Sequence, residues 1–323
     1  MAAMKLGLVP PAAFIGALLL APATYAAKLE PASVIVGGEQ RDYITVSADA
    51  VAQGPRPLVL LLHGHIGTAA NALGSGKMPS PLSAWIDIVD REQLLVVAPQ
   101  GLKGSDRQTG WRDCRSDNTT NPRVDDVAFV SAVVHRLVEA KRVDPSRVYA
   151  MGMSNGAMMT HRLALEMRPA PAAIAAVSGT LAAKSDCKRA SRAVSVLLIH
   201  GTNDPLVPYG GGAVSLRNNE RGLVIGVAAT RDYWLKADHL ENAIPVAFDF
   251  PHGGTDPSHA VRTTYGGDAG PQVVVLTIQG GGHIEPSLRF HYGPWYSRFV
   301  GLQNRDLESA EEAWAFFRTK SRQ

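Results

Sequence analysis

The run Gly152-Met153-Ser154-Asn155-Gly156 constrains the fold of this chain more than any other feature of the sequence. Before it, residues 147–152 form an apolar run typical of a strand buried on both faces. After it, residues 157–167 carry the periodicity of a helix. A sharp strand-to-helix turn of this kind strains the backbone of its central serine and requires small residues on either side. The run therefore predicts that Ser154 projects above the carboxyl edge of a sheet.

Strand-like and helix-like segments alternate along the rest of the chain. Further strands are predicted at residues 58–62, 94–98, 172–177, 194–200 and 273–278. Further helices are predicted at residues 127–140, 230–237 and 308–318. A hairpin is predicted from residues 34–36 and 43–46, joined through Gly37 and Gly38. This alternation indicates an α/β fold with a mostly parallel central sheet and helices on both of its faces.

Several local features refine this prediction. Asp125 and Asp126 precede the helix at 127–140, and both are expected to cap its free N–H groups. No Pro/Ser/Gly linker or repeat divides the chain, so residues 27–323 are expected to form a single domain. Residues 178–193 are too few for a large helical lid over the site. Residues 101–124 are predicted to form a long loop, of a kind that is usually either functional or disordered. The segment 239–272 gives no readable pattern.

Composition excludes several classes of protein. The chain has 323 residues, of which 46% are hydrophobic and 19% charged, so it is not disordered. Two cysteines are too few for a disulfide scaffold. The formal net charge of +3 is not gathered in a basic run, so no nucleic-acid partner is expected. No apolar run long enough for a membrane helix follows the N-terminus.

Residues 1–26 have the layout of a secretory signal peptide. A basic start with Lys5 is followed by an apolar stretch at 6–20 and by small residues, so cleavage is predicted after Ala26 or Ala27. The alternative is a membrane anchor, but Pro10 and Pro11 interrupt the short apolar stretch. The protein is thus expected to be secreted or periplasmic, with no membrane contact after cleavage. An oxidising compartment would allow a disulfide between the two cysteines, Cys114 and Cys187.

A serine at such a turn becomes a nucleophile when a histidine base, oriented by an acid, removes its proton. On this fold the acid and the histidine follow the serine in the chain. His283 comes directly after the last core strand, and Asp204 follows the strand at 194–200. Ser154, Asp204 and His283 are therefore the predicted catalytic residues. Weaker candidates for the acid are Asp232, Asp238 and Asp256. His200 lies within a strand end and is interpreted as a packing or hydrogen-bonding residue.

An oxyanion hole requires two backbone N–H groups. The residue after the nucleophile, Asn155, is expected to supply one, and His65 in the loop after residues 58–62 the other. Gly64 would allow that loop to bend. The side chains of His63 and His65 precede Ser154 in the chain and are given no catalytic role, although a zinc site from the pair stays open without a third ligand. Trp111 and Tyr209 are equally compatible with walls of a substrate site and with core or rim packing.

These motifs together resemble one branch of the α/β-hydrolases, the secreted polyhydroxybutyrate depolymerases and feruloyl esterases. The matching segments are residues 124–129 through 144–149, 152–159, 200–211 and 281–283. The resemblance implies a serine esterase with the triad named above, acting on an ester substrate of oligomeric or polymer-derived kind, and no cofactor or metal is expected. Ile284-Glu285-Pro286 departs from the family, which more often has a Thr-Trp-Pro type of sequence there.

Two further functional classes stay open at this point. The same triad serves peptidases and acyltransferases, and a non-catalytic binding protein could use the same fold. An unlidded site suits a bulky or polymeric ester. The chain nevertheless leaves no residues for a separate polymer-binding domain, so soluble esters or oligomers are the expected substrates.

Overall fold

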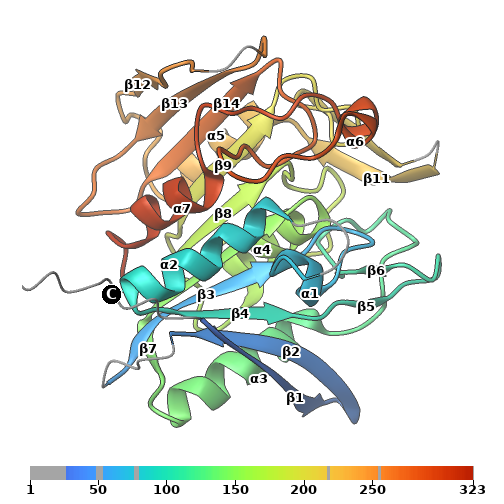
Figure 1. The fold of residues 1–323 in the computed structure, drawn as a ribbon, viewed down its shortest axis with the longest axis vertical. Helices are drawn as coiled ribbons and strands as arrows, with labels where there is room; N and C mark the ends of the chain where they lie inside the picture. The colour runs from blue at the N-terminus through green and yellow to red at the C-terminus, as the bar shows by residue number, and fades with distance from the viewer. Residues whose placement is uncertain (1–26, 49–53, 76–79, 217–218, 254–255, 323) are drawn as a thin grey trace, which may run out of the picture.

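The computed structural model describes residues 27–48, 54–75, 80–216, 219–253 and 256–322 (Figure 1). The predicted signal peptide lies outside the described residues. Ten strands form the central sheet, in the order β1-β2-β4-β3-β7-β8-β9-β14-β13-β12. In that order they span Lys28–Val36, Glu39–Ser47, Leu95–Pro99, Arg56–Leu62, Val143–Met153, Ala173–Val177, Ser195–Gly201, Val273–Gln279, His259–Tyr265 and Val246–Asp249.

The centre of this sheet is parallel and its two edges are antiparallel. Strands β4, β3, β7, β8, β9 and β14 pair in parallel, and they are the six strands predicted from apolar runs. The predicted hairpin is β1–β2, which pairs antiparallel with β4. The structure therefore confirms the α/β fold with a mostly parallel sheet.

Helices cover both faces of the sheet. Leu58, Leu60 and Leu62 of β3 pack into one core with α3 (Asp126–Glu139), α4 (Asn155–Glu166) and α5 (Val227–Ala237). The alternate residues Val59 and Leu61 pack into a second core with α1 (Ala69–Ala72), α2 (Trp85–Glu92) and α7 (Ser309–Phe317). Figure 1 shows α2 and α7 on the near side of the sheet. The continuous apolar run 58–62 in β3 is thus explained by burial of this strand on both faces of the sheet.

The start of α3 confirms one predicted cap and corrects the other. The Asp125 carboxylate accepts a hydrogen bond from the N–H of Ala128 at 2.9 Å, as a capping residue does. Asp126 instead turns inward, where its side chain accepts from Arg41 at 2.7 Å and from the N–H of Arg112 at 2.8 Å. Burial raises the pKa of Asp126, although Arg41 opposes this effect. The prediction that Asp126 caps the helix was wrong, because its two carboxylate oxygens accept from Arg41 on β2 and from Arg112 in the loop 101–124.

Two hairpins lie in segments where no strand was predicted. Strands β12 and β13 fall within the unreadable segment 239–272 and extend the sheet edge beyond β14. Strands β10 (Gly211–Leu216) and β11 (Asn219–Ile225) form a separate two-stranded sheet after Asp204. The loop 101–124 contains only the short pair β5 (Leu102–Lys103) and β6 (Thr109–Gly110). The right-hand side of Figure 1 gathers α1, β5, β6, β11 and α6 (Pro294–Val300).

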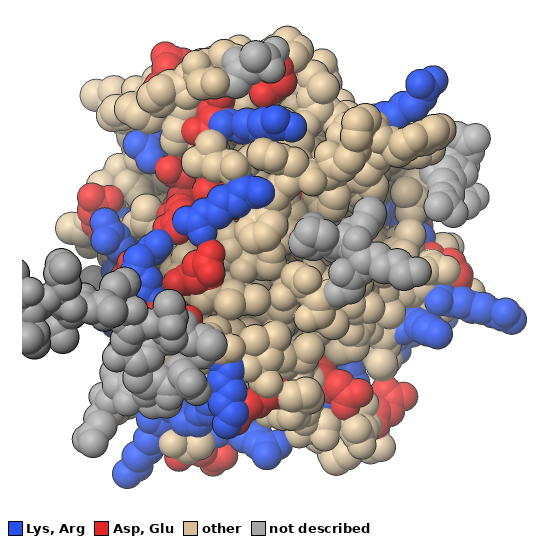
Figure 2. All heavy atoms as spheres, in the orientation of Figure 1, with Lys and Arg blue, Asp and Glu red and all other residues tan. Residues whose placement is uncertain are grey.

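Residues 178–193 contain no helix, which agrees with the expected absence of a large lid. In the part of the chain that the structure describes, no helix has the length and apolar character needed to cross a membrane. On the face shown in Figure 2, Lys and Arg side chains lie among Asp and Glu side chains, and the centre of this face carries few charges.

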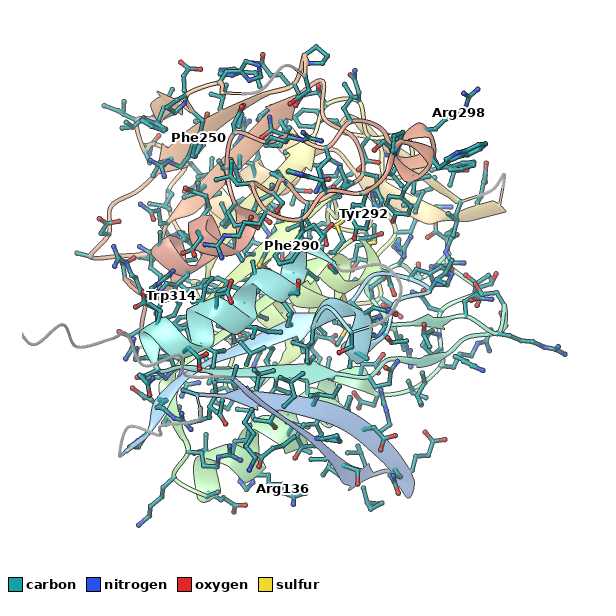
Figure 3. The ribbon with its side chains drawn as sticks, in the orientation of Figure 1. Arg136, Phe250, Phe290, Tyr292, Arg298 and Trp314 are labelled. Carbon is teal, nitrogen blue, oxygen red and sulfur yellow. A yellow bond between two sulfur atoms is a disulfide. The ribbon has the colours of Figure 1, made fainter. Side chains whose placement is uncertain are left out.

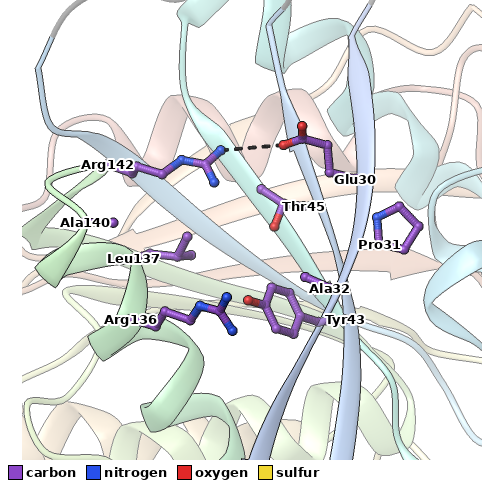
Figure 4. A pocket seen from close by; sticks show the side chains of 9 residues that line it. All are labelled: Glu30, Pro31, Ala32, Tyr43, Thr45, Arg136, Leu137, Ala140 and Arg142. Atoms are coloured by element: carbon purple, nitrogen blue, oxygen red, sulfur yellow. Dashed lines mark ion pairs between the residues drawn. The ribbon is translucent and has the colours of Figure 1, made fainter.

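A pocket of about 410 Å³ lies between β1, β2 and α3 (Figure 4). Tyr43, Arg136 and the ion pair of Arg142 with Glu30 line it. None of the predicted site residues is among its walls. This pocket is therefore a gap between the first hairpin and α3, and it is separate from the predicted site residues.

Candidate active site

Ser154 lies at the turn between β7 and α4, in the strained conformation that the sequence predicts. Its φ of 56° and ψ of −120° place a non-glycine residue in the left-handed half of backbone space. Its N–H donates to the carbonyl of Val177 at 2.8 Å, which fixes the turn to the neighbouring strand β8. A side chain at Gly152 would overlap Gly156, and one at Gly156 would overlap backbone atoms of Leu62. The flanking glycines are therefore required by the packing of α4 on the sheet.

The structure brings Ser154, His283 and Asp204 together from three separate loops. His283 Nε2 lies 2.9 Å from Ser154 Oγ, and His283 Nδ1 lies 2.8 Å from Asp204 Oδ2. The other carboxylate oxygen, Asp204 Oδ1, accepts hydrogen bonds from the N–H groups of Leu206 and Val207, each at 2.8 Å. All the groups needed for proton transfer from the serine hydroxyl to the imidazole are thus in hydrogen-bonding contact.

The charge state of Asp204 follows from these contacts. Burial opposes ionisation of this carboxyl, but the charge of His283 and hydrogen bonds from His200 and His283 outweigh it, so the pKa of Asp204 is held well below its usual range. An ionised Asp204 keeps the proton of His283 on Nδ1, which leaves Nε2 free to accept from Ser154.

Close packing of two strand ends positions His283. Strands β9 and β14 are parallel neighbours, so the loops after them leave the sheet side by side. A side chain at Gly201 would overlap the carbonyls of Gly281 and Gly282. The N–H of His283 donates to the carbonyl of Val300 at the end of α6. The loop that carries His283 is thereby held between β9 and α6.

The three weaker candidates for the acid have other partners. Asp232 is exposed and pairs with Arg231 at 2.7 Å. Asp238 accepts from the N–H of Val194 at 3.0 Å, and Asp256 accepts from the N–H of Ser258 at 3.0 Å. Asp204 is the candidate that contacts His283.

The loop after β3 approaches the serine as the oxyanion prediction requires. A β-carbon built at Gly64 would lie 3.5 Å from Ser154 Cβ, so this backbone passes directly beside the serine. The next two amides of this loop already have acceptors in the protein. The N–H of Ile66 donates to the carbonyl of Thr109 at 2.9 Å, and the N–H of Gly67 donates to the carbonyl of Gly64 at 3.0 Å. Among the described residues, no hydrogen bond engages the amide N–H of His65 or of Asn155. Both N–H groups are available to a ligand.

The side chain of His65 belongs to a network that the sequence did not reveal. Its Nε2 lies 3.1 Å from Asp106 Oδ2, and its Nδ1 lies 3.1 Å from Arg221 Nη2. Arg221 also pairs with Asp106 at 2.7 Å. Burial, followed by the nearby Arg221 charge, lowers the pKa of His65 to about 4, so the imidazole is neutral at pH 7. Arg221 lies on β11, and no local pattern connects it with residue 65.

His63 is fully engaged by backbone groups. Its Nδ1 donates to the carbonyl of Gly64 at 2.8 Å, and its Nε2 accepts from the N–H of Gly101 at 3.0 Å. Burial lowers its pKa to about 4. Both ring nitrogens are already used, so the zinc pair of His63 with His65 does not fit the structure.

Of the two interpretations of Trp111, a substrate wall or core packing, its contacts are those of core packing. Its side chain is fully buried, its Nε1 donates to the carbonyl of His63 at 2.8 Å, and its ring packs on the His63 ring. The N–H of Trp111 also donates to Asn155 Oδ1 at 2.7 Å. Trp111 therefore connects the loop 101–124 to the turn of Ser154 from inside the protein.

A buried polar network continues from Asn155. Its Nδ2 donates to Asp113 Oδ2 at 2.7 Å, and Asp113 forms an ion pair with Arg115 at 2.6 Å. Burial opposes ionisation of Asp113, but the Arg115 charge outweighs it and the pKa of Asp113 is lowered. A glycine-rich, polar loop is thus ordered by satisfied buried contacts.

Tyr209 is half-buried and packs on the acid side of the triad. Its ring meets the ring of His200 edge-on at 5.9 Å, and its hydroxyl lies 3.1 Å from Thr277 Oγ1. Its contacts are those of the packing alternative, whereas no contact joins it to Ser154 within the described part of the chain.

The predicted disulfide between Cys114 and Cys187 is present. Next to the disulfide, the backbones of Arg115 and Ser185 pair as an isolated antiparallel β-bridge. The disulfide joins the loop 101–124 to the segment between β8 and β9.

The segment after His283 is buried. Ile284 is 5% exposed and Glu285 is 4% exposed. The carbonyl of Glu285 accepts from Gln303 Nε2 at 3.0 Å, and burial raises the pKa of its carboxyl. These two residues hold the His283 loop and do not form an open surface. Two exposed apolar side chains belong to residues whose backbone adjoins the site. Ile66 follows His65 in sequence, and the carbonyl of Leu302 accepts from the N–H of Gly282.

Comparison with known proteins agrees with this geometry. The α/β-hydrolase family model described as Phospholipase/Carboxylesterase matches residues 47–218. "Putative esterase NocK" from Nocardia uniformis subsp. tsuyamanensis is 34% identical over 298 residues, which cover 88% of this chain and 80% of that protein. "Probable feruloyl esterase C" from Aspergillus niger is 28% identical over 225 residues, covering 67% of this chain and 76% of that protein.

A solved structure shows the same fold. The acetyl xylan esterase from Aspergillus awamori superposes with a TM-score of 0.55 at 14% identity, over 90% of this chain and 99% of that one. The family model covers more than half of this chain, and the esterase relative spans most of it. The chain therefore belongs to the phospholipase/carboxylesterase family of α/β-hydrolases, and it is a carboxylic ester hydrolase.

Proposed function

We propose that this protein is an exported serine esterase that uses Ser154, His283 and Asp204 to cleave carboxylic esters through an acyl-enzyme. The observation that carries the proposal is the position of the His283 ring, whose nitrogens lie 2.9 Å from Ser154 Oγ and 2.8 Å from Asp204 Oδ2. Two separate hydrogen bonds of this length orient one imidazole between a hydroxyl and a carboxylate, which is the arrangement needed for general-base catalysis.

In the first half-reaction Ser154 Oγ attacks the ester carbonyl carbon while its proton passes to His283 Nε2. The tetrahedral intermediate then collapses, the carbon–oxygen bond to the alcohol breaks, and His283 returns the proton to the leaving alkoxide. In the second half-reaction His283 removes a proton from water, which attacks the acyl-enzyme. The carboxylic acid leaves and Ser154 recovers its proton. Asp204 stabilises the imidazolium during both halves.

The oxyanion of each intermediate would be bound by the N–H groups of His65 and Asn155. His65 follows Gly64, whose backbone passes beside Ser154, and Asn155 follows Ser154 in the chain. The side chains of the same two residues are fixed by Arg221 with Asp106 and by Trp111 with Asp113. Donors whose backbone is rigid before the substrate arrives lose little energy in reorganisation, which favours catalysis.

The proposed substrates are polyhydroxyalkanoate oligomers and feruloyl or acetyl-type esters. The names of the feruloyl esterase C and acetyl xylan esterase relatives support the second class, and the short connection at residues 178–193 supports access for a bulky ester. The half-buried Tyr209 and the exposed Ile66 and Leu302 are the side chains that we propose for substrate contact. Export is supported by the Cys114–Cys187 disulfide, which persists in oxidising compartments.

Hydrolysis by the purified full chain tests the proposal. The panel would contain p-nitrophenyl acetate and butyrate, methyl ferulate, hydroxybutyrate oligomers and a peptide p-nitroanilide. We expect ester cleavage that Ser154→Ala abolishes and that Ser33→Ala, a serine on the distant strand β1, leaves unchanged. Cleavage of the anilide alone would favour a peptidase. The absence of any ester hydrolysis, or full activity in Ser154→Ala, would overturn the proposal.

A further inference from the structure

Three side chains from distant parts of the sequence meet beside the antiparallel edge of the sheet. His252 follows β12, His259 begins β13, and Asp306 lies between α6 and α7. His252 Nδ1 lies 2.8 Å from Asp306 Oδ1, and His259 Nδ1 lies 3.7 Å from Asp306 Oδ2. We propose that these three residues form a binding site for a divalent transition metal, with Zn²⁺ as the ion that fits best.

The spacing of the three ligand atoms suits a metal ion. One nitrogen from each imidazole and one carboxylate oxygen all lie within 4.8 Å of one another. In a tetrahedral zinc site the bonds are about 2.0–2.1 Å long, so neighbouring ligand atoms are about 3.3 Å apart. The observed distances lie on either side of this value and involve the two oxygens of one carboxylate, 2.8 Å from His252 Nδ1 to Asp306 Oδ1 and 3.7 Å from His259 Nδ1 to Asp306 Oδ2. Small rotations of the exposed His252 ring would complete one face of a tetrahedron and leave the fourth position to water.

The arrangement around His259 and Asp306 is already that of a metal ligand pair. His259 Nε2 lies 3.3 Å from Asp249 Oδ1, a distance at which a proton on Nε2 would be donated to that carboxylate. The Asp306 carboxylate is buried and accepts from the N–H of Ala260 at 2.9 Å and from Asn304 Nδ2 at 3.0 Å. Metal-binding histidines characteristically donate their second nitrogen to such an outer carboxylate, and ligating carboxylates are themselves hydrogen-bonded.

The two ring nitrogens of His259 face two different carboxylates. Asp249 Oδ1 lies 3.3 Å from Nε2, and Asp306 Oδ2 lies 3.7 Å from Nδ1. A metal ion bound at Nδ1 would therefore lie between His259 and the Asp306 carboxylate, where it would also take His252 as a ligand.

The site would fasten the sheet edge to the segment that supports the catalytic loop. Asp306 belongs to the connection between α6 and α7, and residues of the same connection contact the loop of His283. The carbonyl of Leu302 accepts from Gly282, and Gln303 donates to the carbonyl of Glu285. Figure 3 shows Phe250, two residues before His252, on the opposite side of the view from Arg298 of α6. The expected role is therefore structural, with added thermal stability and without participation in ester cleavage.

Zinc titration of the purified full chain tests this inference. The protein would carry no polyhistidine tag and would be treated with a chelator before calorimetry. We expect one Zn²⁺ per chain, no comparable heat with Mg²⁺, and a higher melting temperature in Zn²⁺. His252→Ala and His259→Ala should each weaken Zn²⁺ binding at least about tenfold, and Asp249→Asn should weaken it about tenfold through the outer carboxylate.

The matched control is His135→Ala, which removes another exposed histidine paired with a carboxylate, Glu139. It should leave Zn²⁺ affinity and the melting-temperature shift unchanged. Circular dichroism of each variant without metal would verify folding. No saturable Zn²⁺ binding by the folded wild-type chain would overturn the inference, as would equal affinities in His259→Ala and His135→Ala. The latter result would place the bound ion elsewhere, including on His283.

Discussion

His200 Nε2 lies 3.3 Å from Asp204 Oδ2, the same oxygen that accepts the hydrogen bond of His283. The His200 nitrogen also donates to the carbonyl of Val207 at 2.8 Å. A second imidazole thus contacts the same carboxylate oxygen as His283, and it connects Asp204 to the residues whose N–H groups donate to its other oxygen. The interpretation of His200 as a hydrogen-bonding residue agrees with these contacts, and its closeness to Asp204 makes it a positioning residue for the proposed triad.

His200→Asn should therefore lower kcat with little change in KM. Asn lacks a donor at the position of Nε2, and a lost hydrogen bond to a charged group costs about 1.5 kcal/mol, which corresponds to about tenfold in rate. His200→Gln can return a donor near that position and should recover part of the loss. Steady-state kinetics on p-nitrophenyl butyrate measures both variants. An equal loss in the two, or a loss confined to KM, would contradict a positioning role.

Gly64→Ala should reduce kcat while leaving the free energy of unfolding nearly unchanged. The new β-carbon would make ordinary contacts, 3.4 Å from the Met153 carbonyl and 3.5 Å from Ser154 Cβ, so the fold tolerates it. It would nevertheless occupy space beside the nucleophile, and a barrier raised by about 1.4 kcal/mol lowers the rate about tenfold. Gly267→Ala, where a β-carbon meets nothing within 4 Å, is the control. Equal activity of both variants would show that the Gly64 loop does not border the reacting ester.

Asp113→Ala should destabilise the chain strongly. It removes the partner of the buried Arg115, and breaking a buried ion pair on one side costs about 3–5 kcal/mol. It also removes an acceptor of Asn155, so kcat should fall in the fraction that remains folded. Asp186→Ala removes the exposed pair with Arg112, at 3.7 Å, and should cost less than about 1 kcal/mol. Urea denaturation of the two variants gives the comparison; similar midpoints would refute the role of the buried network.

Replacing both cysteines by serine should lower the free energy of unfolding by about 4 kcal/mol. The disulfide closes a loop with a sequence separation of 73, and most of its stabilisation is expected from restricting the unfolded chain. Denaturant unfolding with and without reductant measures this, and intact-mass analysis after alkylation counts free thiols. Two alkylated thiols in the unreduced wild-type protein would disprove the bridge.

The buried carboxyl of Asp238 predicts a pH dependence of stability. Burial raises its pKa to about 7, although the N–H of Val194 donates to it. An unfolded aspartate titrates near pH 4, so between about pH 4 and 7 the folded chain keeps a proton that the unfolded chain releases. The free energy of unfolding therefore falls as pH rises through this window, by up to about 1.4 kcal/mol per pH unit.

Asp238→Asn should remove this decline, because the amide stays neutral at every pH and still accepts from Val194. Asp232→Asn, which changes an exposed aspartate on α5, should retain it. Urea denaturation at pH 5 and pH 7 measures the difference. Parallel pH dependences of the two variants would contradict the assignment to Asp238.

Local signals in the sequence account for the parallel centre of the fold and for the triad geometry. A strand buried on both faces must be apolar at every position, so the six central strands are visible as uninterrupted runs. The elbow around Ser154 is a local steric requirement, and it is satisfied by the two glycines that the packing demands. Once the strands were placed, Asp204 and His283 followed from their positions at strand ends, because parallel strands bring their carboxyl ends to one edge.

Tertiary packing decided everything that depends on contacts between distant and polar segments. Strands β12 and β13 carry exposed or half-buried residues at the sheet edge, so no apolar run marks them. In the sequence Trp111 is compatible with a substrate wall and with packing, and only its contacts with the carbonyl of His63 and the side chain of Asn155 place it in the core. Arg221 reaches His65 across 156 residues, and Asp306 reaches His252 across 54. The sequence by itself determined the features that depend on a single strand, turn or helix, such as the buried strands and the turn of Ser154. The folded chain alone decided which polar groups meet, because burial and pairing of polar side chains arise only when separate loops are brought to the same place.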